Sequence, residues 1–318
     1  RVASVLLAFI MFAAVPVVSS SWELVYDSGL DYLYSIETYK GRLYVGGGAD
    51  SKVYSFDGEN WTLAYDPDGY YVTAMGVYMD NLFIGTSYPG RIYTFDGSQW
   101  RLSYDAGATA YIYAFIVYNG KLYAGWGDPA AVYVYDGTSW QPSASSLSGM
   151  YVRSFAIYDN KLYASTEGGY IHVFDGNSWS LAYDSPESDV YSLIVFDNKL
   201  YAGTGSQGRI YVYDGSSWSV DFDSPQYQIM DFIVYGNELY AAAAYGGVVY
   251  KFTGDNWIEI FNTIQDEANA FSQYGAKLYT VCGYKGVVFS FTEFDYSLSA
   301  SPSEVQLSRG DTKSSTLN

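Results

Sequence analysis

Few side chains in this sequence could carry out chemistry, and the most suggestive of them are carboxylates in its second half. Asp189, Asp231 and Glu267 follow one another at intervals of 42 and 36 residues, and Arg153 stands 36 residues before Asp189. Two carboxyls about 5 to 10 Å apart form the catalytic pair of most glycoside hydrolases. Asp189 and Glu267 are therefore the candidate pair of a glycoside-acting enzyme.

The same three carboxylates also suggest a binding site. Like charges that converge raise one another's pKa unless a cation or a hydrogen-bonding ligand relieves the repulsion. Ca²⁺, which favours six to eight oxygen ligands, or a polyhydroxylated ligand would do so. The sequence contains no Asp-x-Asp-x-Asp calcium loop, so we expect an organic ligand and neither a metal ion nor a cofactor.

Aromatic and amide side chains occupy positions equivalent to these carboxylates. One row of equivalent positions holds Tyr32, Tyr71, Tyr111, Tyr151, Asp189, Gln228 and Glu267, and the row two residues later holds Tyr34, Thr73, Tyr113, Arg153, Tyr191, Met230 and Asn269. Aromatic rings beside a few convergent polar groups are the usual composition of a ligand site. The candidate ligand-binding residues are Tyr71, Tyr111, Trp126, Arg153, Asp189, Gln228, Asp231, Glu267 and Asn269.

The single histidine and the single cysteine are better explained as structural residues. His172 stands where the other units carry Tyr54, Tyr93, Tyr133, Tyr211 and Tyr250. It is therefore predicted to replace one amphipathic ring by another. Cys282 has no partner for an internal disulfide and is predicted to be a buried, inert thiol.

These positions are equivalent because the chain is a repeat. Tryptophan recurs at intervals of 39, 39, 40, 39, 39 and 39 residues, at positions 22, 61, 100, 140, 179, 218 and 257. Such a period is typical of propellers and solenoids. Each unit reads as four short strands, and most of the turns between its first and second strands contain Asn, Asp or Gly, as in Asp80-Asn81, which suit two-residue hairpins.

The units predict an all-β fold: a seven-bladed β-propeller of four-stranded antiparallel blades. The repeat begins at Trp22 with an outer-type strand and ends at residues 287–291, after which no outer-type strand follows. Pairing the two would close the last blade with the N-terminal strand and remove an exposed sheet edge. We call the side that carries the second-to-third-strand loops and the connections between units the loop face.

The unit resembles a kelch-type repeat of the galactose-oxidase-like propellers, as in Asn119-Gly120-Lys121-Leu122-Tyr123-Ala124-Gly125 followed by residues 132–140. The resemblance covers residues 22–291 and implies a fold rather than a function. A copper radical oxidase of this kind needs at least two histidine ligands. The sequence has a single histidine, so this activity is excluded. A sialidase-like enzyme needs an arginine triad, for which Arg91, Arg153 and Arg209 are available, but Arg91 and Arg209 occupy equivalent repeat positions.

Charge and the two ends of the sequence bear on the compartment. The net charge of −18 disfavours nucleic acid as a partner. Residues 1–20 have the layout of a secretory signal peptide, with Arg1 before an apolar stretch and then small residues. Residues 21–293 form the predicted propeller. Residues 294–318 are rich in Ser and Thr and resemble a linker and the opening strand of an Ig-like surface domain, as in a longer modular chain.

These features predict a secreted or cell-surface protein without membrane insertion of its mature domain. The leading hypothesis is a non-catalytic recognition module that binds a glycan or a surface protein through the loop face. A sialidase-like or other glycoside-acting enzyme is the first alternative, and a structural spacer of a cell-surface layer is the second.

Overall fold

The computed structural model describes residues 22–263 and 267–292, and these residues form one compact unit. Their regular structure consists of 28 β-strands. In this part of the chain no helix is long and apolar enough to cross a membrane. The predicted signal peptide at 1–20 and the predicted linker and Ig-like segment at 294–318 lie outside the described residues.

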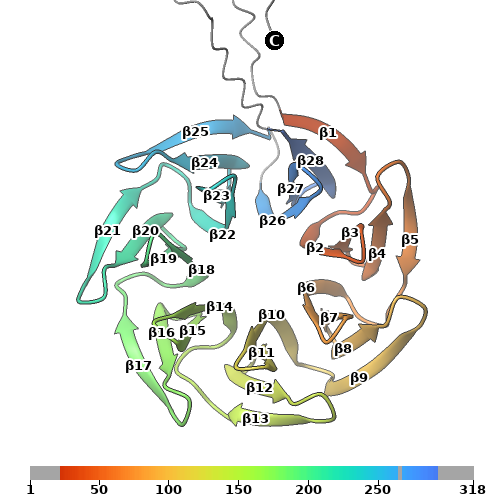
Figure 1. Cartoon of the computed structure of the whole chain (residues 1–318), viewed down its shortest axis with the longest axis horizontal. Coiled ribbons are helices and arrows are strands. Elements are labelled where there is room, and N and C mark those ends of the chain that lie inside the picture. Colours follow the sequence, from red (N-terminus) through yellow and green to blue (C-terminus); the bar gives the residue numbers. More distant parts are fainter. Residues whose placement is uncertain (1–21, 264–266, 293–318) are drawn as a thin grey trace, which may run out of the picture. The chain divides into compact units, whose positions relative to one another are not determined.

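The strands take four roles that recur along the chain and are arranged around a ring (Figure 1). The inner strands are β2 (Leu33–Tyr39), β6 (Tyr71–Tyr78), β10 (Tyr111–Tyr118), β14 (Val152–Tyr158), β18 (Val190–Phe196), β22 (Gln228–Tyr235) and β26 (Ala268–Tyr274). The second strands are β3 (Arg42–Gly47), β7 (Asn81–Ser87), β11 (Lys121–Gly127), β15 (Lys161–Thr166), β19 (Lys199–Thr204), β23 (Glu238–Ala244) and β27 (Lys277–Cys282). The third strands are β4 (Lys52–Phe56), β8 (Gly90–Phe95), β12 (Ala131–Tyr135), β16 (Tyr170–Phe174), β20 (Arg209–Tyr213), β24 (Val248–Phe252) and β28 (Val287–Phe291). The outer strands are β1 (Trp22–Asp27), β5 (Trp61–Tyr65), β9 (Trp100–Gly107), β13 (Trp140–Ala144), β17 (Trp179–Asp184), β21 (Trp218–Asp223) and β25 (Trp257–Asn262).

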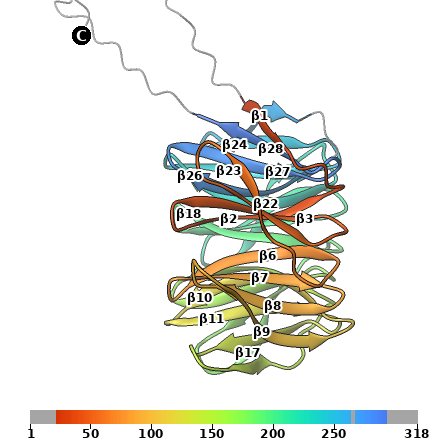
Figure 2. The ribbon, with the colours of Figure 1, turned by 90° about the vertical axis from the view of Figure 1, so that its right-hand side faces the viewer.

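Consecutive strands pair antiparallel in groups of four, as the hairpin turns predict. The order β2-β3-β4-β5 recurs in β14 to β17, β18 to β21 and β22 to β25. The groups β6 to β9 and β10 to β13 are joined into one eight-stranded sheet by the single pair Tyr111 and Ser87. In the remaining sheet, β1 pairs with β28, in the order β1-β28-β27-β26. Figure 2 shows the ring of strands from the side.

Local turn chemistry explains why the strands begin and end where they do. Asp80, Asn119 and Asn160 have φ values between 46° and 58° in the turns from first to second strand, a conformation that Asn and Asp tolerate well. In the turn before β5, the Asp57 carboxylate accepts hydrogen bonds from the backbone N–H groups of Glu59 and Asn60. The repeated Asp-Gly pair is thus a turn device, as the sequence predicts.

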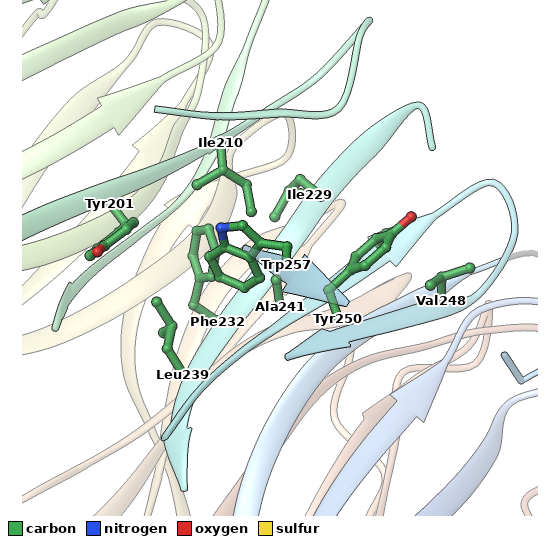
Figure 3. Packing of buried hydrophobic residues seen from close by; sticks show 10 residues of the cluster. Tyr201, Ile210, Ile229, Phe232, Leu239, Ala241, Val248, Tyr250 and Trp257 are labelled. Carbon is green, nitrogen blue, oxygen red and sulfur yellow. The ribbon is translucent and has the colours of Figure 1, made fainter. Parts of the chain in front are cut away.

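The periodic tryptophans hold neighbouring sheets together. Trp61 stacks on its cross-strand partner Phe56, with ring centroids 4.9 Å apart, and on Tyr26 of the neighbouring sheet, at 4.3 Å. Trp257 lies in a buried cluster that also contains Phe232 and Tyr250 (Figure 3). Stacked aromatic rings stabilise a core beyond the apolar area that they bury.

Tyrosine hydroxyls add polar links between neighbouring sheets at the opposite side from the loop face. The hydroxyls of Tyr39, Tyr78 and Tyr118, each the last residue of an inner strand, donate to backbone carbonyls in the first hairpin of the next sheet at 2.7 to 2.8 Å. Tyr274 of β26 makes the same link to Gly41, after β2, at 3.0 Å. The last inner strand, β26, therefore contacts the first one, β2, in the way that β2, β6 and β10 contact their next neighbours.

Candidate functional site

Every inner strand contains a β-bulge at the same place, at its second or third residue. The pairing with the second strand skips one residue in each case, for example between Leu33 and Ser35 in β2. The skipped residues are Tyr34, Thr73, Tyr113, Arg153, Tyr191, Met230 and Asn269. A bulge leaves its extra residue unpaired and re-aims the side chain, which is why bulges are frequent beside functional sites.

All of these bulge residues line one cavity of about 550 Å³ at the inner strands. The residue that follows each bulge lines it too: Ser35, Ala74, Ala114, Ser154, Ser192, Asp231 and Ala270. Tyr71, Tyr88 and Tyr111 contribute to the wall from the loop face. The cavity therefore has an aromatic upper wall, a lower ring of small residues, and Asp231 as the exception in that lower ring.

Arg153 is the cation of the cavity wall, and three tyrosine rings surround it. Its guanidinium carbon lies 4.5 Å from the ring centroid of Tyr113, 5.0 Å from that of Tyr151 and 5.2 Å from that of Tyr191. One terminal nitrogen lies 3.3 Å from Glu167 Oε2. Cation–π contacts of this kind are strongest when the cation is partly desolvated, and the Arg153 side chain is only 19% exposed.

Three tyrosines of the cavity wall, Tyr34, Tyr113 and Tyr191, remain protonated at neutral pH. Burial raises the pKa of Tyr191 to about 12, and burial also raises the pKa of Tyr34 and Tyr113 above the usual range. Their hydroxyls can therefore donate and accept hydrogen bonds, while their rings offer apolar faces. Such groups match ligands that combine polar atoms with flat or apolar surfaces.

Asp231 is the most unusual group in the cavity. Its Oδ2 accepts a hydrogen bond from the backbone N–H of Phe271 at 2.8 Å, across to the next inner strand. Desolvation raises the pKa of Asp231 to about 7, against the opposing effect of the Phe271 and Phe232 backbone N–H groups. No ion pair joins Asp231 to another residue of the described ranges. The site therefore contains a carboxyl without a counter-ion.

The cavity brings together some of the residues that the sequence singles out. It contains Tyr71, Tyr111, Arg153, Asp231 and Asn269. Asn269 is buried, and its amide nitrogen donates to the Leu33 carbonyl at 2.8 Å.

Asp189 and Gln228 do not line the cavity. Gln228 donates to the hydroxyl of Tyr191, a residue of the cavity wall, at 3.0 Å. Asp189 accepts a hydrogen bond from Ser188 at 2.7 Å and lines a separate groove together with Asp128 and Glu167.

The expected convergence of Asp189, Asp231 and Glu267 is therefore wrong. Asp189 raises the pKa of Tyr191, whereas Glu267 raises that of Tyr32 and Tyr34. The described residues contain no group of three or more His, Cys, Asp or Glu side chains that could hold a metal ion. Of the row that precedes the bulge, Tyr71 and Tyr111 line the cavity, whereas Asp189 and Glu267 do not.

The expectation that Trp126 rims the cavity is also wrong. Its indole is 6% exposed and stacks on Tyr133, with ring centroids 3.6 Å apart, inside a core cluster. Trp126 pairs with Ile112, and the equivalent positions hold the buried residues Gly47, Thr86, Thr166, Thr204, Ala243 and Cys282. Side chains alternate along a strand, so this position faces the neighbouring sheet and not the cavity.

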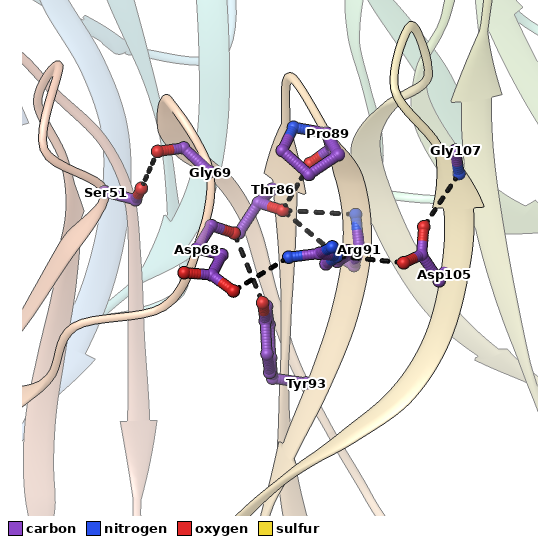
Figure 4. Close-up of polar contacts among 9 residues, drawn as sticks. All are labelled: Ser51, Asp68, Gly69, Thr86, Pro89, Arg91, Tyr93, Asp105 and Gly107. Carbon is purple, nitrogen blue, oxygen red and sulfur yellow. Dashed lines mark hydrogen bonds and ion pairs between the residues drawn. The ribbon is translucent and has the colours of Figure 1, made fainter.

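Two of the three arginines considered for a sialidase-like triad are committed elsewhere. Arg91 lies 3.0 Å from both Asp68 and Asp105 (Figure 4). Arg209 pairs in the same way with Glu187 and Asp223, at 3.1 and 3.3 Å. Of the three, only Arg153 is among the residues that line the cavity. The repeated ion pairs fasten connecting loops to the third strands and leave no triad.

His172 and Cys282 lie in the scaffold. His172 pairs with Ala164, as Tyr211 pairs with Ala202, and its Nε2 lies 3.1 Å from the Ser148 carbonyl oxygen. Burial lowers the pKa of His172. Cys282 is fully buried, and burial raises the pKa of its thiol to about 12. The thiol is therefore not a nucleophile at neutral pH.

Comparison with known proteins identifies the fold. A family profile described as "DUF6242 beta propeller domain" matches residues 104–226. The chain is a β-propeller. The match does not confirm the kelch-like type expected from the repeat.

Solved structures of low identity have the same fold. "YCF48 bound to D1 peptide" is 12% identical with a TM-score of 0.65, over 86% of this chain and 95% of that one. The WD40 repeats of RRP9 are 11% identical with a TM-score of 0.66, over 85% and 97%. A comparison with curated proteins finds no match.

A third similar structure is the extracellular domain of the putative hybrid two component system BT3049 from B. thetaiotaomicron. It is 13% identical with a TM-score of 0.70. The match covers 85% of this chain and 42% of the BT3049 domain structure. At such identities the likeness concerns the fold alone.

Proposed function

We propose that this chain is a seven-bladed propeller, closed by its N-terminal strand, that acts as a non-catalytic extracellular recognition module. The ligand, a glycan or a protein, enters the cavity from the loop face. The pairing of β1 with β28 and the Tyr274–Gly41 contact support the closure. The fold shared with extracellular domains of bacterial two-component systems supports the location, as does the signal-like sequence at 1–20.

The cavity is the observation that carries the proposal. Its volume of about 550 Å³ is typical of small-ligand sites, which are mostly apolar and contain a few placed polar groups. Its wall departs from the repeat at Arg153, Asp231 and Asn269, whereas a spacer would have no need of such departures. The site also lies at the loop face, where propeller-like scaffolds carry binding residues.

The glycoside-acting alternative has less support. Its chemistry requires two carboxyls about 5 to 10 Å apart. Among the described residues that line the cavity, Asp231 alone carries a carboxyl. Asp189 and Glu267, the expected pair, lie outside its wall.

A glycan array and a panel of surface proteins, screened with residues 21–293, test the recognition function. Tyr113→Ala removes a ring that faces both the cavity and Arg153, so it should weaken any ligand found by about tenfold or more. Leu102→Ala, an exposed change on the outer strand β9, is the control and should bind as the wild type does. Equal binding by both variants would place the site elsewhere.

A further inference from the structure

We propose that the cavity receives the cationic end of an arginine or lysine side chain from a partner polypeptide, with Asp231 as its counter-ion. This inference rests on the proposed function and specifies the chemistry of the ligand. Four features of the described residues support it: the departure of Asp231 from the repeat, its lack of a counter-ion, the tyrosine wall, and the acidic groove beside the cavity.

The fold does not require a carboxyl at position 231. The equivalent residues of the other inner strands are Ser35, Ala74, Ala114, Ser154, Ser192 and Ala270. The Ser154 hydroxyl accepts a hydrogen bond from the Leu193 backbone N–H at 3.1 Å, in the same way that Asp231 accepts from Phe271 at 2.8 Å. A serine thus fulfils the structural task, and the charge of Asp231 remains to be explained.

The charge also lacks compensation within the protein. The cation of the cavity wall, Arg153, is paired with Glu167, and Asp231 has no ion pair among the described residues. Desolvation opposes ionisation of Asp231, as its pKa of about 7 shows. A ligand cation beside the carboxyl would offset this cost, because an opposite charge favours the ionised form.

The tyrosine wall suits a guanidinium or ammonium group. Arg153 already lies against Tyr113, Tyr151 and Tyr191 within 5.2 Å of each ring centroid. Tyr34 and Tyr71, which line the same cavity, contact each other edge to face with centroids 5.2 Å apart. Such rings can contribute cation–π attraction to an incoming cation.

An acidic groove adjoins the cavity and favours a polypeptide as the source of the cation. Asp128, Glu167 and Asp189 line this groove of about 570 Å³. The Arg153–Glu167 pair joins the groove to the cavity wall. A basic peptide segment could lie in the groove while one of its side chains enters the cavity. The net charge of −18 would also accelerate the encounter with such a partner at low ionic strength.

The test uses two defined peptides, acetyl-Gly-Gly-Arg-Gly-Gly-amide and the same peptide with citrulline in place of arginine. Citrulline keeps the shape of the side chain and removes its charge. Binding is measured calorimetrically at pH 8 to the wild type, Asp231→Asn, Asp231→Ser and Glu23→Gln. Glu23 is an exposed residue of the outer strand β1, so Glu23→Gln makes the same change in net charge away from the cavity.

We expect the arginine peptide to bind the wild type and Glu23→Gln equally, and both Asp231 variants about tenfold or more weakly, as when one partner of a desolvated charge pair is removed. The citrulline peptide should bind all four proteins as weakly as the arginine peptide binds the Asp231 variants. Asp231→Ser reproduces the arrangement at Ser154, so a folded variant is available even if Asp231→Asn fails to fold. Equal binding of the arginine peptide by the wild type and Asp231→Ser would overturn the inference.

A second arm separates this inference from the proposed function. Tri-glucosamine, a sugar chain whose amines are partly protonated at pH 7, and neutral tri-N-acetylglucosamine are titrated into the same proteins at pH 7. Asp231-dependent binding of tri-glucosamine without peptide binding would overturn the polypeptide source and leave recognition intact. If other glycans bind but neither cationic probe does, the inference fails and the proposed function stands. If the wild type binds no probe and no array ligand, both fail.

Discussion

Asp231 Oδ2 accepts a hydrogen bond from the Phe271 backbone N–H at 2.8 Å and so joins two neighbouring inner strands. Its counterpart Ser154 accepts a hydrogen bond from the Leu193 backbone N–H and so joins the inner strands β14 and β18 with a neutral hydroxyl. The scaffold therefore tolerates either residue at this position, and the two differ in the charge that they bring into the cavity. This difference makes Asp231 a sensitive probe of both stability and binding.

Asp231→Ser should stabilise the unliganded protein at pH 8 and do so less as the pH falls toward 4. The folded-state pKa of Asp231, about 7, lies above its unfolded value, so the folded protein binds the extra proton. Its cost to folding therefore appears above about pH 4 and grows until the pH passes about 7. Glu37, whose pKa burial raises to about 6, contributes equally to both proteins.

Urea unfolding of the wild type and Asp231→Ser at pH 4.5, 6 and 8 measures this difference. The serine variant should have the higher midpoint at pH 8, and the gap should narrow at each lower pH. A gap independent of pH would mean that Asp231 is not desolvated in the folded protein.

His172→Tyr should leave stability at pH 8 nearly unchanged and make the protein less sensitive to acid. Tyrosine occupies the equivalent position in Tyr93 and Tyr211, and the Tyr93 hydroxyl donates to a connecting-loop carbonyl, that of Asp68, at 3.2 Å. Burial lowers the pKa of His172 below its unfolded value of about 6.5. The unfolded state therefore takes up the proton first, and stability is lost as the pH falls below about 6.5.

Thermal melts of both proteins at pH 8 and pH 5 test this prediction, with ligand binding as a second measurement. The two melting temperatures should agree at pH 8, and the tyrosine variant should melt higher at pH 5. Loss of ligand binding in His172→Tyr would contradict the scaffold role.

The repeat predicts the fold well because it sets strands and turns by local chemistry. The spacing of Trp61 and Trp100, with hairpin residues such as Asn119-Gly120, predicts the four-stranded units that pair as expected. The cavity is harder to predict because a bulge does not alter the spacing of the repeat. Tyr32 and Tyr34 look like successive members of one face, yet the bulge residue Tyr34 and its neighbour Ser35 line the cavity and Tyr32 does not.

The error at Trp126 had a signal in the sequence. The equivalent positions hold small residues such as Thr86 and Thr166, which suggests a confined place between sheets. The missing counter-ion of Asp231 had no such signal, because it depends on which side chains meet in space.

Gly125→Ala should destabilise the fold by about 1 to 3 kcal/mol through overpacking. A Cβ at Gly125 would lie 2.7 Å from Val152 Cγ1 and 2.9 Å from Val152 Cβ, on the inner strand of the neighbouring sheet. The equivalent residue of β15 is Ser165, whose side chain is already accommodated. Ser165→Ala is therefore the control and should unfold close to the wild-type midpoint in urea. Equal midpoints for Gly125→Ala and the wild type would show that the two sheets can separate at little cost.

The N-terminal strand should be essential to the fold, and Trp22 should account for much of its contribution. Trp22 stacks on Phe291 of its own sheet, with ring centroids 5.0 Å apart, and on Phe261 of the neighbouring sheet, at 4.9 Å. Trp22→Ala removes both contacts and should lower the free energy of unfolding by about 2 to 4 kcal/mol. Leu24→Ala, on the same strand but 57% exposed, should change the free energy of unfolding little.

Deletion of residues 21–27 should have a larger effect than Trp22→Ala, because it exposes the edge of β28 to pairing with other chains. Melting curves and light scattering of the three variants measure these effects. A deletion variant that stays monomeric and melts within a degree or two of the intact protein would show that β1 does not close the ring.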